Sequence, residues 1–150
     1  MFCGESTHSM DKKGRVFLPK RFQDSLTRDS QDNLSGVLTF GFEGCLFIFS
    51  KDEFAALRER HAADVFGSPQ TRKRNRRFFS KVREFTLDGS GRMLVPDFFR
   101  THADIDGEVV MVGVSDHAEM WSSARWAEQE SYDDDFDTLG DGEGFGQEAQ

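Results

Sequence analysis

The chain contains one short motif twice, and this duplication is the feature that most restricts how it can fold. The first copy runs from Met10 to Pro19 and the second from Leu87 to Pro96. Both copies have Asp, Gly, Arg and Pro at the same positions, and three apolar residues separate Arg from Pro. Apolar segments downstream also recur: 37–42 matches 109–114, and 46–49 matches 118–121. The sequence therefore predicts two tandem copies of one short unit.

Each motif begins with the residues of a tight turn. Asp11 and Asp88 can accept hydrogen bonds from the backbone that follows them. Gly14 and Gly91 can adopt the positive φ that closes a hairpin with a bulge. Each turn is followed by an apolar run that is suited to a short buried strand.

Helices are predicted at four places by their start signals. A Pro ends each apolar run, and because Pro is favourable at the first position of a helix, short helices are predicted at 20–26 and 97–103. A capping box at 50–53 starts a longer helix that reaches about residue 64. Another helix is predicted at 71–82, after a Gly-Ser-Pro break.

The remaining apolar segments predict two further hairpins and a short final helix. The strands 37–42 and 45–49 flank one turn, and 108–114 and 117–121 flank another. A helix is expected around 125–126. The two units together hold about eight short strands, enough for a small closed barrel with paired edges. The predicted fold class is α+β, mainly β.

The negative charge of the chain is concentrated at its C-terminal end. The formal net charge is −8, but residues 128–150 hold nine of the 27 acidic residues and none of the 19 basic ones. Residues 1–127 are therefore close to neutral and could bind a polyanion. The acidic tail, poor in apolar residues, is expected to be disordered.

Several classes of protein find little support in the sequence. There is no apolar run of about 18 residues and no secretion signal, which indicates a cytoplasmic protein without a membrane span. Cys3 and Cys45 are expected to be free thiols. The four His residues lack metal-ligand spacing, and no nucleophile or phosphate-loop motif is present. We expect no catalytic residue, metal, cofactor or small-molecule ligand.

The arginine of each motif is the main candidate for function. Arg15 and Arg92 each follow a turn glycine, so a duplicated hairpin presents them in equivalent positions. Arg is well suited to bidentate contact with guanine or phosphate. Lys12 and Lys13 add positive charge to the first turn only. From the residues alone, contact with DNA and simple exposed turn arginines are equally good interpretations.

A second basic cluster lies at 72–83. On a helix, Lys73, Arg77 and Lys81 would lie one above another, and such spacing of like charges is unfavourable. A negatively charged partner must offset this repulsion. We favour a neighbouring subunit or the acidic tail over DNA. The 16 Phe residues also exceed what a small barrel needs, so some are expected to pack between subunits.

The duplicated motif and its flanking residues resemble the MraZ proteins, which are SpoVT/AbrB-like swapped-hairpin DNA-binding proteins. The likeness extends from residue 1 to about 126. It is carried by Met1, Phe2, Gly4, Glu5, His8, Asp11, Lys12, Lys13, Gly14, Arg15, Leu18, Pro19, Phe22, Asp88, Gly91, Arg92, Pro96, Val112, Gly113, Glu119 and Trp121. Cys3, Ser90 at the position of Lys13, and the acidic tail depart from the family pattern.

The resemblance implies a pseudo-twofold swapped-hairpin β-barrel with added helices that assembles into a ring-shaped homo-oligomer. It implies sequence-specific binding to double-stranded promoter DNA with tandem short repeats, in the division and cell-wall gene cluster, by a cytoplasmic, nucleoid-associated transcriptional regulator. The DNA contacts carry over onto Lys13, Arg15 and Arg92, with Lys12 as a further candidate.

The expected division is a first repeat at 5–52, a helical connector at 53–81, a second repeat at 82–125 and the tail at 128–150. Two alternative functions stay open. One is a DNA-independent ring-forming scaffold, and the other is an AbrB-like antitoxin. An antitoxin needs apolar anchors in its tail, and this tail offers only Tyr132, Phe136, Leu139 and Phe145.

Overall fold

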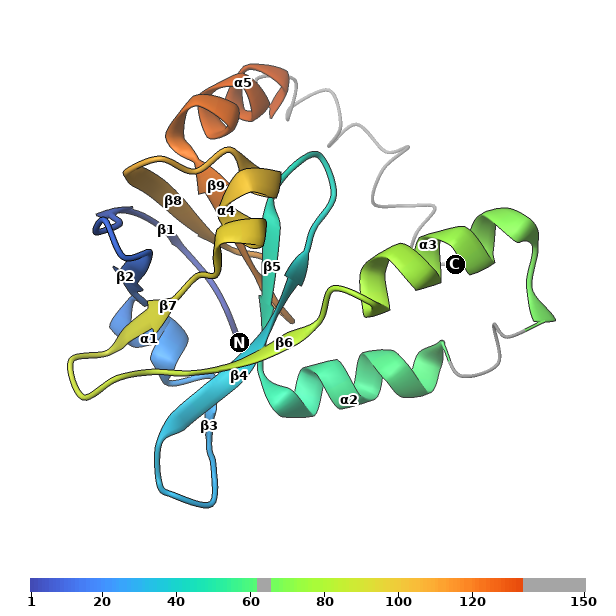
Figure 1. Cartoon of the computed structure of the whole chain (residues 1–150), viewed down its shortest axis with the longest axis horizontal. Helices are drawn as coiled ribbons and strands as arrows, with labels where there is room; N and C mark the ends of the chain where they lie inside the picture. Colours follow the sequence, from blue (N-terminus) through green and yellow to red (C-terminus); the bar gives the residue numbers. More distant parts are fainter. Residues whose placement is uncertain (62–65, 134–150) are drawn as a thin grey trace.

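The computed structural model describes residues 1–61 and 66–133 of the chain. It has an α+β structure whose strand pairs are all antiparallel (Figure 1). The strands are β1 (Glu5–Ser9), β2 (Arg15–Phe17), β3 (Thr27–Arg28), β4 (Leu34–Phe40), β5 (Leu46–Phe49), β6 (Arg83–Thr86), β7 (Arg92–Leu94), β8 (Glu108–Gly113) and β9 (Ala118–Ser122). The helices are α1 (Lys20–Gln23), α2 (Lys51–Arg60), α3 (Pro69–Phe79), α4 (Asp97–Ala103) and α5 (Ser123–Asp133).

The strands exchange partners between the two repeats. In the larger sheet the order is β1-β8-β9-β5-β4-β3, and β6 also pairs with β4. The first strand of each repeat therefore pairs with the other repeat, β1 with β8 and β6 with β4. The strands that follow the two motif turns, β2 and β7, pair only with each other.

The strand register has a pseudo-twofold relation. Val16 lies opposite its own counterpart Met93, and Phe47 lies opposite its counterpart Glu119. The pair Thr7–Val110 has its equivalent in Glu84–Val37.

This register corrects our alignment of the second hairpins by one residue, since Val37 matches Val110 and not Val109. The reason is that the turn of the second hairpin is shorter than the turn of the first. Gly41 N donates to Cys45 O in the first hairpin, whereas Val114 N donates to His117 O in the second (both 2.8 Å).

The predicted closed barrel is not formed by the described strands. The sheet order ends at β1 and β3, and the ribbon of β2 and β7 is a separate sheet. The strands β2 and β7 are three residues long. Pro19 and Pro96 then begin helices α1 and α4, and Pro cannot donate a hydrogen bond to a ladder. The two prolines therefore end β2 and β7, the two strands that would have to be longer for a barrel to close.

The main core lies between the ribbon and the larger sheet. Alternate residues of each motif point inward, and those from the first copy, Val16, Leu18 and Phe22, are at most 2% exposed. Their counterparts Met93, Val95 and Phe99 are fully buried. The middle residues of the apolar runs were predicted to be buried with them, but Phe17 and Leu94 are 50% and 55% exposed because they lie on the other face of the ribbon.

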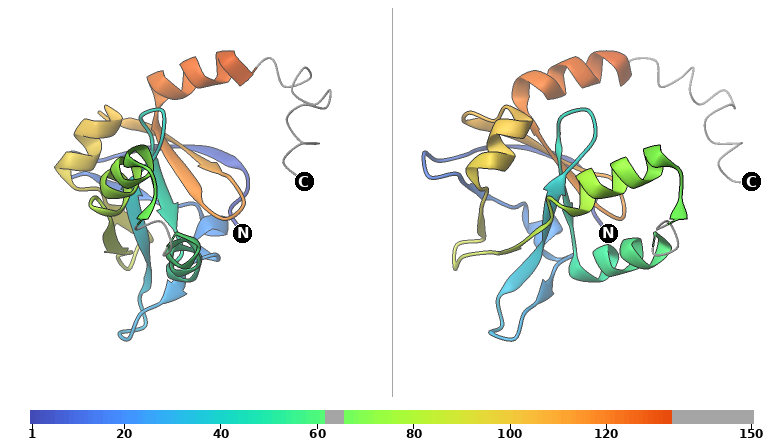
Figure 2. Two further views of the ribbon diagram at one scale, coloured as in Figure 1. Left: turned by 90° about the vertical axis from the view of Figure 1, so that its right-hand side faces the viewer. Right: turned by 45° about the vertical axis from the view of Figure 1, so that its right-hand side comes forward.

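A second cluster holds α2 and α3 against β5. It contains Phe47, Phe49, Phe54 and Trp121, and Phe78 and Phe79 pack against it. Thr39 Oγ1 also donates to Phe78 O (2.9 Å). The two helices project from the same side of the sheet (Figures 1 and 2).

The helix ends follow their local capping residues. Helix α3 begins two residues before its predicted start because Ser68 Oγ accepts from Thr71 N (3.2 Å) and Pro69 occupies the first turn. It ends at Phe79, so Lys81 is not helical and the predicted stack of Lys73, Arg77 and Lys81 is wrong at its last member.

Helix α2 begins at its predicted cap, with Ser50 Oγ accepting from Glu53 N (3.1 Å), and ends at Arg60. Residues 62–65, where its predicted end falls, lie outside the described part. Helix α5 covers 123–133, so residues 128–133 of the expected tail are helical, and the rest of that tail, 134–150, lies outside the described residues. No helix in the described part of the chain has the length and apolar character needed to cross a membrane.

Candidate nucleic-acid interface

The first motif turn is organised around the carboxylate of Asp11. Its Oδ1 accepts from the backbone N–H groups of Lys13 and Arg15 (both 2.9 Å). Its Oδ2 accepts from the side-chain Nε of Arg15 at 2.7 Å. Gly14 has φ +87° and donates its N–H to Asp11 O (3.0 Å). One aspartate thus closes the turn and fixes the direction of the arginine beside it.

The second motif turn repeats this arrangement. Asp88 Oδ1 accepts from the N–H groups of Ser90 (2.9 Å) and Arg92 (3.0 Å). Asp88 Oδ2 accepts from Arg92 Nε at 2.9 Å. Gly91 has φ +85° and donates to Asp88 O (3.0 Å). The two arginines are therefore held in the same way by the same chemistry.

These hydrogen bonds lower the pKa of both aspartates. For each carboxyl the largest cause is the bond from the backbone N–H of the arginine, followed among the lowering effects by the other turn hydrogen bonds. Both carboxylates therefore stay ionised at neutral pH. Each occupies only the Nε of its arginine, and within residues 1–61 and 66–133 no hydrogen bond engages the Nη atoms of Arg15 or Arg92.

The two turns are joined into one rigid unit. Val95 N donates to Gly14 O (2.8 Å), and in the symmetric contact Leu18 N donates to Gly91 O (3.1 Å). A Cβ atom on Gly14 would lie 2.8 Å from Val95 O, so this approach requires glycine. Because the turns bond to each other, their arginines have a fixed relation.

The outer face of the β2–β7 ribbon carries four side chains. Arg15 lies opposite Leu94 and Phe17 lies opposite Arg92, while Val16 and Met93 point into the core. The two arginines occupy diagonal corners, which in an antiparallel pair are about 7–8 Å apart. The Arg92 guanidinium lies 5.9 Å from the centre of the Phe17 ring. We call Arg15, Phe17, Arg92 and Leu94 the ribbon face.

Phe17 and Leu94 were missed as surface residues, although strand alternation with an inward Val16 and Leu18 indicates that Phe17 points outward. Lys12 and Lys13, also predicted to contact DNA, are exposed on the first turn beside the ribbon face. The second turn has Gly89 and Ser90 there, so the two halves differ in charge.

Most of the basic cluster at 72–83 lies on helix α3, on the other side of the molecule from β2 and β7 in Figure 1. Arg83, the first residue of β6, instead lines a small cavity together with Leu94 of the ribbon face. Arg77 and Lys81 both lie over the ring of Phe40, each 5.7 Å from its centre. Arg83 lies 5.2 Å from the centre of the Phe98 ring. These aromatic faces offset part of the repulsion that we expected among the like charges.

Elsewhere in the described part of the chain, burial is the main cause of three further pKa shifts. Burial raises the pKa of the Cys45 thiol far above its ordinary value, so this cysteine stays protonated. Burial also lowers the pKa of His8 and His102, each next to arginine. Within the described residues, no group of three or more His, Cys, Asp or Glu is placed to hold a metal ion.

The exchanged strands and the shared ribbon define a class of duplicated hairpin protein in which two equivalent turns present arginines on one face. Comparison with known proteins gives the family. The family described as "MraZ protein, putative antitoxin-like" matches this chain at residues 1–77 and again at 78–140. The chain belongs to the MraZ family, and the resemblance found in its sequence is confirmed.

Curated relatives cover most of the chain. The protein called transcriptional regulator MraZ in Heliobacterium modesticaldum is 39% identical over 127 residues, which are 85% of each chain. That of Desulfitobacterium hafniense strain Y51 is 40% identical over 128 residues, again 85% of each chain. That of Pediococcus pentosaceus is 36% identical over 143 residues, covering 89% of this chain and 93% of the relative.

Proposed function

We propose that this protein is a transcriptional regulator that binds promoter DNA through the ribbon face. The observation that carries the proposal is the pair of arginines anchored by aspartate through Nε, with their Nη atoms unengaged by the described residues. The name of the curated relatives, transcriptional regulator MraZ, supports the same function. The proposal involves no catalytic step, cofactor or small-molecule ligand.

A two-stranded ribbon has the right size for this role. The major groove of B-DNA is about 12 Å wide and admits such a ribbon, and bidentate Arg contacts there read guanine O6 and N7. Arg15 and Arg92 would contact bases or phosphates. Lys13, and Lys12 beside it, would contact phosphate, so the lysine-bearing first turn would contribute more electrostatic attraction than the second.

The ordering of the arginines before binding also favours recognition. A free arginine loses side-chain entropy when it is fixed on a base. Here Asp11 and Asp88 have already restricted Arg15 and Arg92, so less is lost on binding. Each aspartate also reduces the net positive charge of its turn. This weakens the electrostatic attraction to DNA of any sequence more than it weakens sequence-specific contacts.

The finer fold and assembly are part of the proposal. We propose that the exchange of β1 and β6 between repeats is the swapped-hairpin arrangement of SpoVT/AbrB-like proteins, and that subunits join into a ring. A ring presents the ribbon face at regular intervals, and tandem short repeats in a promoter supply matching sites. Weak individual contacts then give tight binding through effective concentration.

The targets and location follow from the same resemblance. We propose that the repeats lie in the promoter of the division and cell-wall gene cluster and that the protein acts in the cytoplasm at the nucleoid. A DNA-independent scaffold and an antitoxin are the competing functions. The scaffold predicts that the parent protein shows no preference for promoter over random DNA, and the antitoxin predicts a partner protein held by the tail.

The test is a binding titration with the chain's own upstream promoter DNA. We expect Arg15→Ala to weaken binding by about 1–3 kcal/mol for each engaged subunit, which is roughly 5- to 150-fold. Arg28→Ala is the matched control, because Arg28 forms another exposed pair with the acid four residues on, Asp32 (3.7 Å), away from the ribbon. Equal affinity of the Arg15 and Arg28 variants would refute the proposal.

A further inference from the structure

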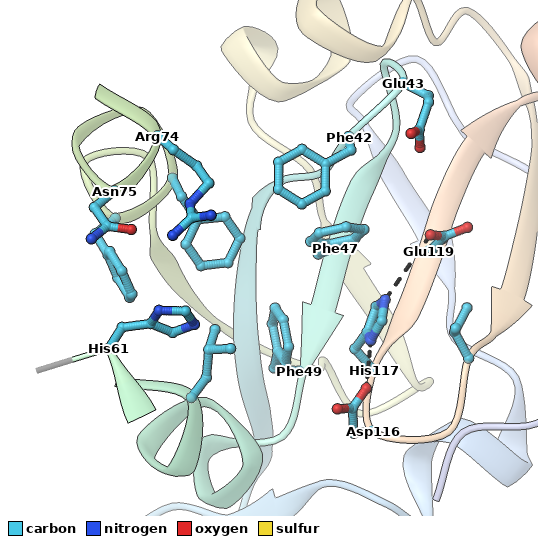
Figure 3. A pocket seen from close by; sticks show the side chains of 14 residues that line it. Phe42, Glu43, Phe47, Phe49, His61, Arg74, Asn75, Asp116, His117 and Glu119 are labelled. Atoms are coloured by element: carbon cyan, nitrogen blue, oxygen red, sulfur yellow. Dashed lines mark hydrogen bonds and ion pairs between the residues drawn. The ribbon is translucent and has the colours of Figure 1, made fainter. Parts of the chain in front are cut away.

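A groove of about 460 Å³ lies between helices α2 and α3 and the turns of the β4–β5 and β8–β9 hairpins (Figure 3). Its lining is mainly aromatic: Phe47 and Phe49 from β5 pack against Phe78 from α3, with both pairs of ring centres 6.3 Å apart, and Phe79 lies beside them. Phe42 stands at its edge and is 54% exposed. An exposed aromatic lining of this kind can bury apolar side chains that are brought to it.

The two walls differ in charge. On the α3 side Arg74 lines the groove, and Arg72, Lys73, Arg76 and Arg77 are exposed on the same helix.

On the strand side the acids already have partners within the wall. His117 Nδ1 is 2.7 Å from Asp116 Oδ1, its Nε2 is 4.0 Å from Glu119 Oε2, and Trp121 Nε1 donates to Glu119 Oε1 (2.9 Å). Glu43 adds one more carboxylate at this edge. The α3 side thus carries positive charge, and an occupant with apolar side chains and negative charge is complementary to it.

The chain itself contains such a segment. Residues 134–150 include six acidic residues and no basic one, together with Phe136, Leu139 and Phe145. The segment follows α5, which begins directly after β9, the strand that contributes Glu119 to the groove wall. Its 17 residues can span up to about 55–60 Å when extended, and four glycines allow it to turn back.

We propose that residues 134–150 dock into this groove of their own chain. Phe136 and Leu139 pack onto the exposed aromatic lining of the groove, and the neighbouring carboxylates face its α3 side, where Arg74 lies. The docked segment covers apolar surface and neutralises a basic helix at the same time. The docking does not depend on DNA binding by the ribbon face, so the two proposals can fail separately.

The test uses the full-length protein with the photo-crosslinking amino acid p-benzoylphenylalanine at position 136. After irradiation and digestion, mass spectrometry is expected to find crosslinks within one chain to peptides from β5 and α3. Phe42→Ser removes an exposed ring from the groove edge and should lower the crosslink yield several-fold. Phe17→Ser is the matched control, because Phe17 is 50% exposed on the ribbon face and should leave the yield unchanged.

Three results would overturn the proposal. Crosslinks to surfaces outside the groove would place the segment elsewhere. Products of twice the chain mass on a denaturing gel would show that the groove receives a second copy. An equal yield in the Phe42 and Phe17 variants would show that the groove is not what holds the segment. Circular dichroism of both variants verifies that they are folded, so a lost crosslink can be assigned to the groove.

Discussion

The two turn glycines, Gly14 and Gly91, are equivalent in sequence but not in surroundings. Replacing each with alanine should therefore cost different amounts of stability. Both have φ near +85°, which costs an L-residue about 1–2 kcal/mol. At Gly91 the new methyl group meets the side-chain end of Gln23, with Nε2 at 2.7 Å, and this amide can move away at the cost of its hydrogen bond to Leu18 O (2.9 Å). Gly91→Ala should therefore lose the strain energy and at most this one side-chain hydrogen bond.

At Gly14 the nearest atom belongs to the backbone, and the Arg100 side chain is almost as close. The new Cβ would lie 2.8 Å from Val95 O, and relief requires the ribbon to shift. That shift strains the bond from Val95 N to Gly14 O, which is worth about 1 kcal/mol. We therefore expect Gly14→Ala to lower the free energy of unfolding by about 2–4 kcal/mol and Gly91→Ala by a smaller amount, about 1–3 kcal/mol.

The assay is urea unfolding monitored by tryptophan fluorescence, with all variants at one chain concentration because assembly affects apparent stability. Gly89→Ala is the control, since a Cβ there meets nothing within 4 Å and its φ is not positive. It should unfold like the parent. Equal losses at Gly14 and Gly91 would refute the argument that backbone contact between the two turns sets the difference.

Four further outcomes are expected. The pKa values of Asp11 and Asp88 in the folded protein lie below the ordinary 3.8, so their contribution to stability is present above about pH 4 and is lost as the pH falls through the lowered values. In the double variant Asp11→Asn/Asp88→Asn, the free energy of unfolding should therefore fall less steeply at acid pH than in the parent. Ser90→Lys should strengthen binding to any DNA sequence and increase the salt slope by about one. Ending the chain after Asp133 should increase affinity for random DNA, most at low salt, and no change there would count against a charge-covering role for 134–150. Exposed Cys3 should react with iodoacetamide much faster than buried Cys45, and equal labelling rates would contradict the described burial.

The local structure of the turns could be predicted because it depends on neighbouring residues. Asp, Gly and Pro each act within a few positions, so the sequence indicates the Asp11 and Asp88 turns and the helix starts after Pro19 and Pro96. The capping serine of α2 follows from the same kind of signal.

Features that depend on distant partners could not be predicted in this way. Barrel closure fails because β2 and β7 are too short to join the larger sheet, and strand length was set by the two prolines. The one-residue shift in the second hairpin depends on turn length, which the apolar pattern at 109–114 does not reveal. The aromatic groove brings together α2, α3 and β5 with the turn before β9, and their packing has no local sequence signal.

The candidate site contains both features that have a local sequence signal and features that depend on distant partners. Arg15 and Arg92 were found because the duplicated motif marks them, whereas the contribution of Phe17 and Leu94 appears only once β2 and β7 are paired. The pairing also gives the diagonal placement of the two arginines. Neither the distance between them nor their common face follows from two motifs that are far apart in the chain.

The measurement that tests the central claim most directly is promoter binding by Arg15→Ala/Arg92→Ala, compared with the parent and with Arg28→Ala at several salt concentrations. Assembly size is measured in parallel by light scattering. We predict that the parent and the Arg28 variant bind the promoter in preference to random DNA, and that the double variant loses this preference with its assembly unchanged. Undiminished, sequence-dependent binding by the double variant would contradict the claim that the ribbon face reads DNA.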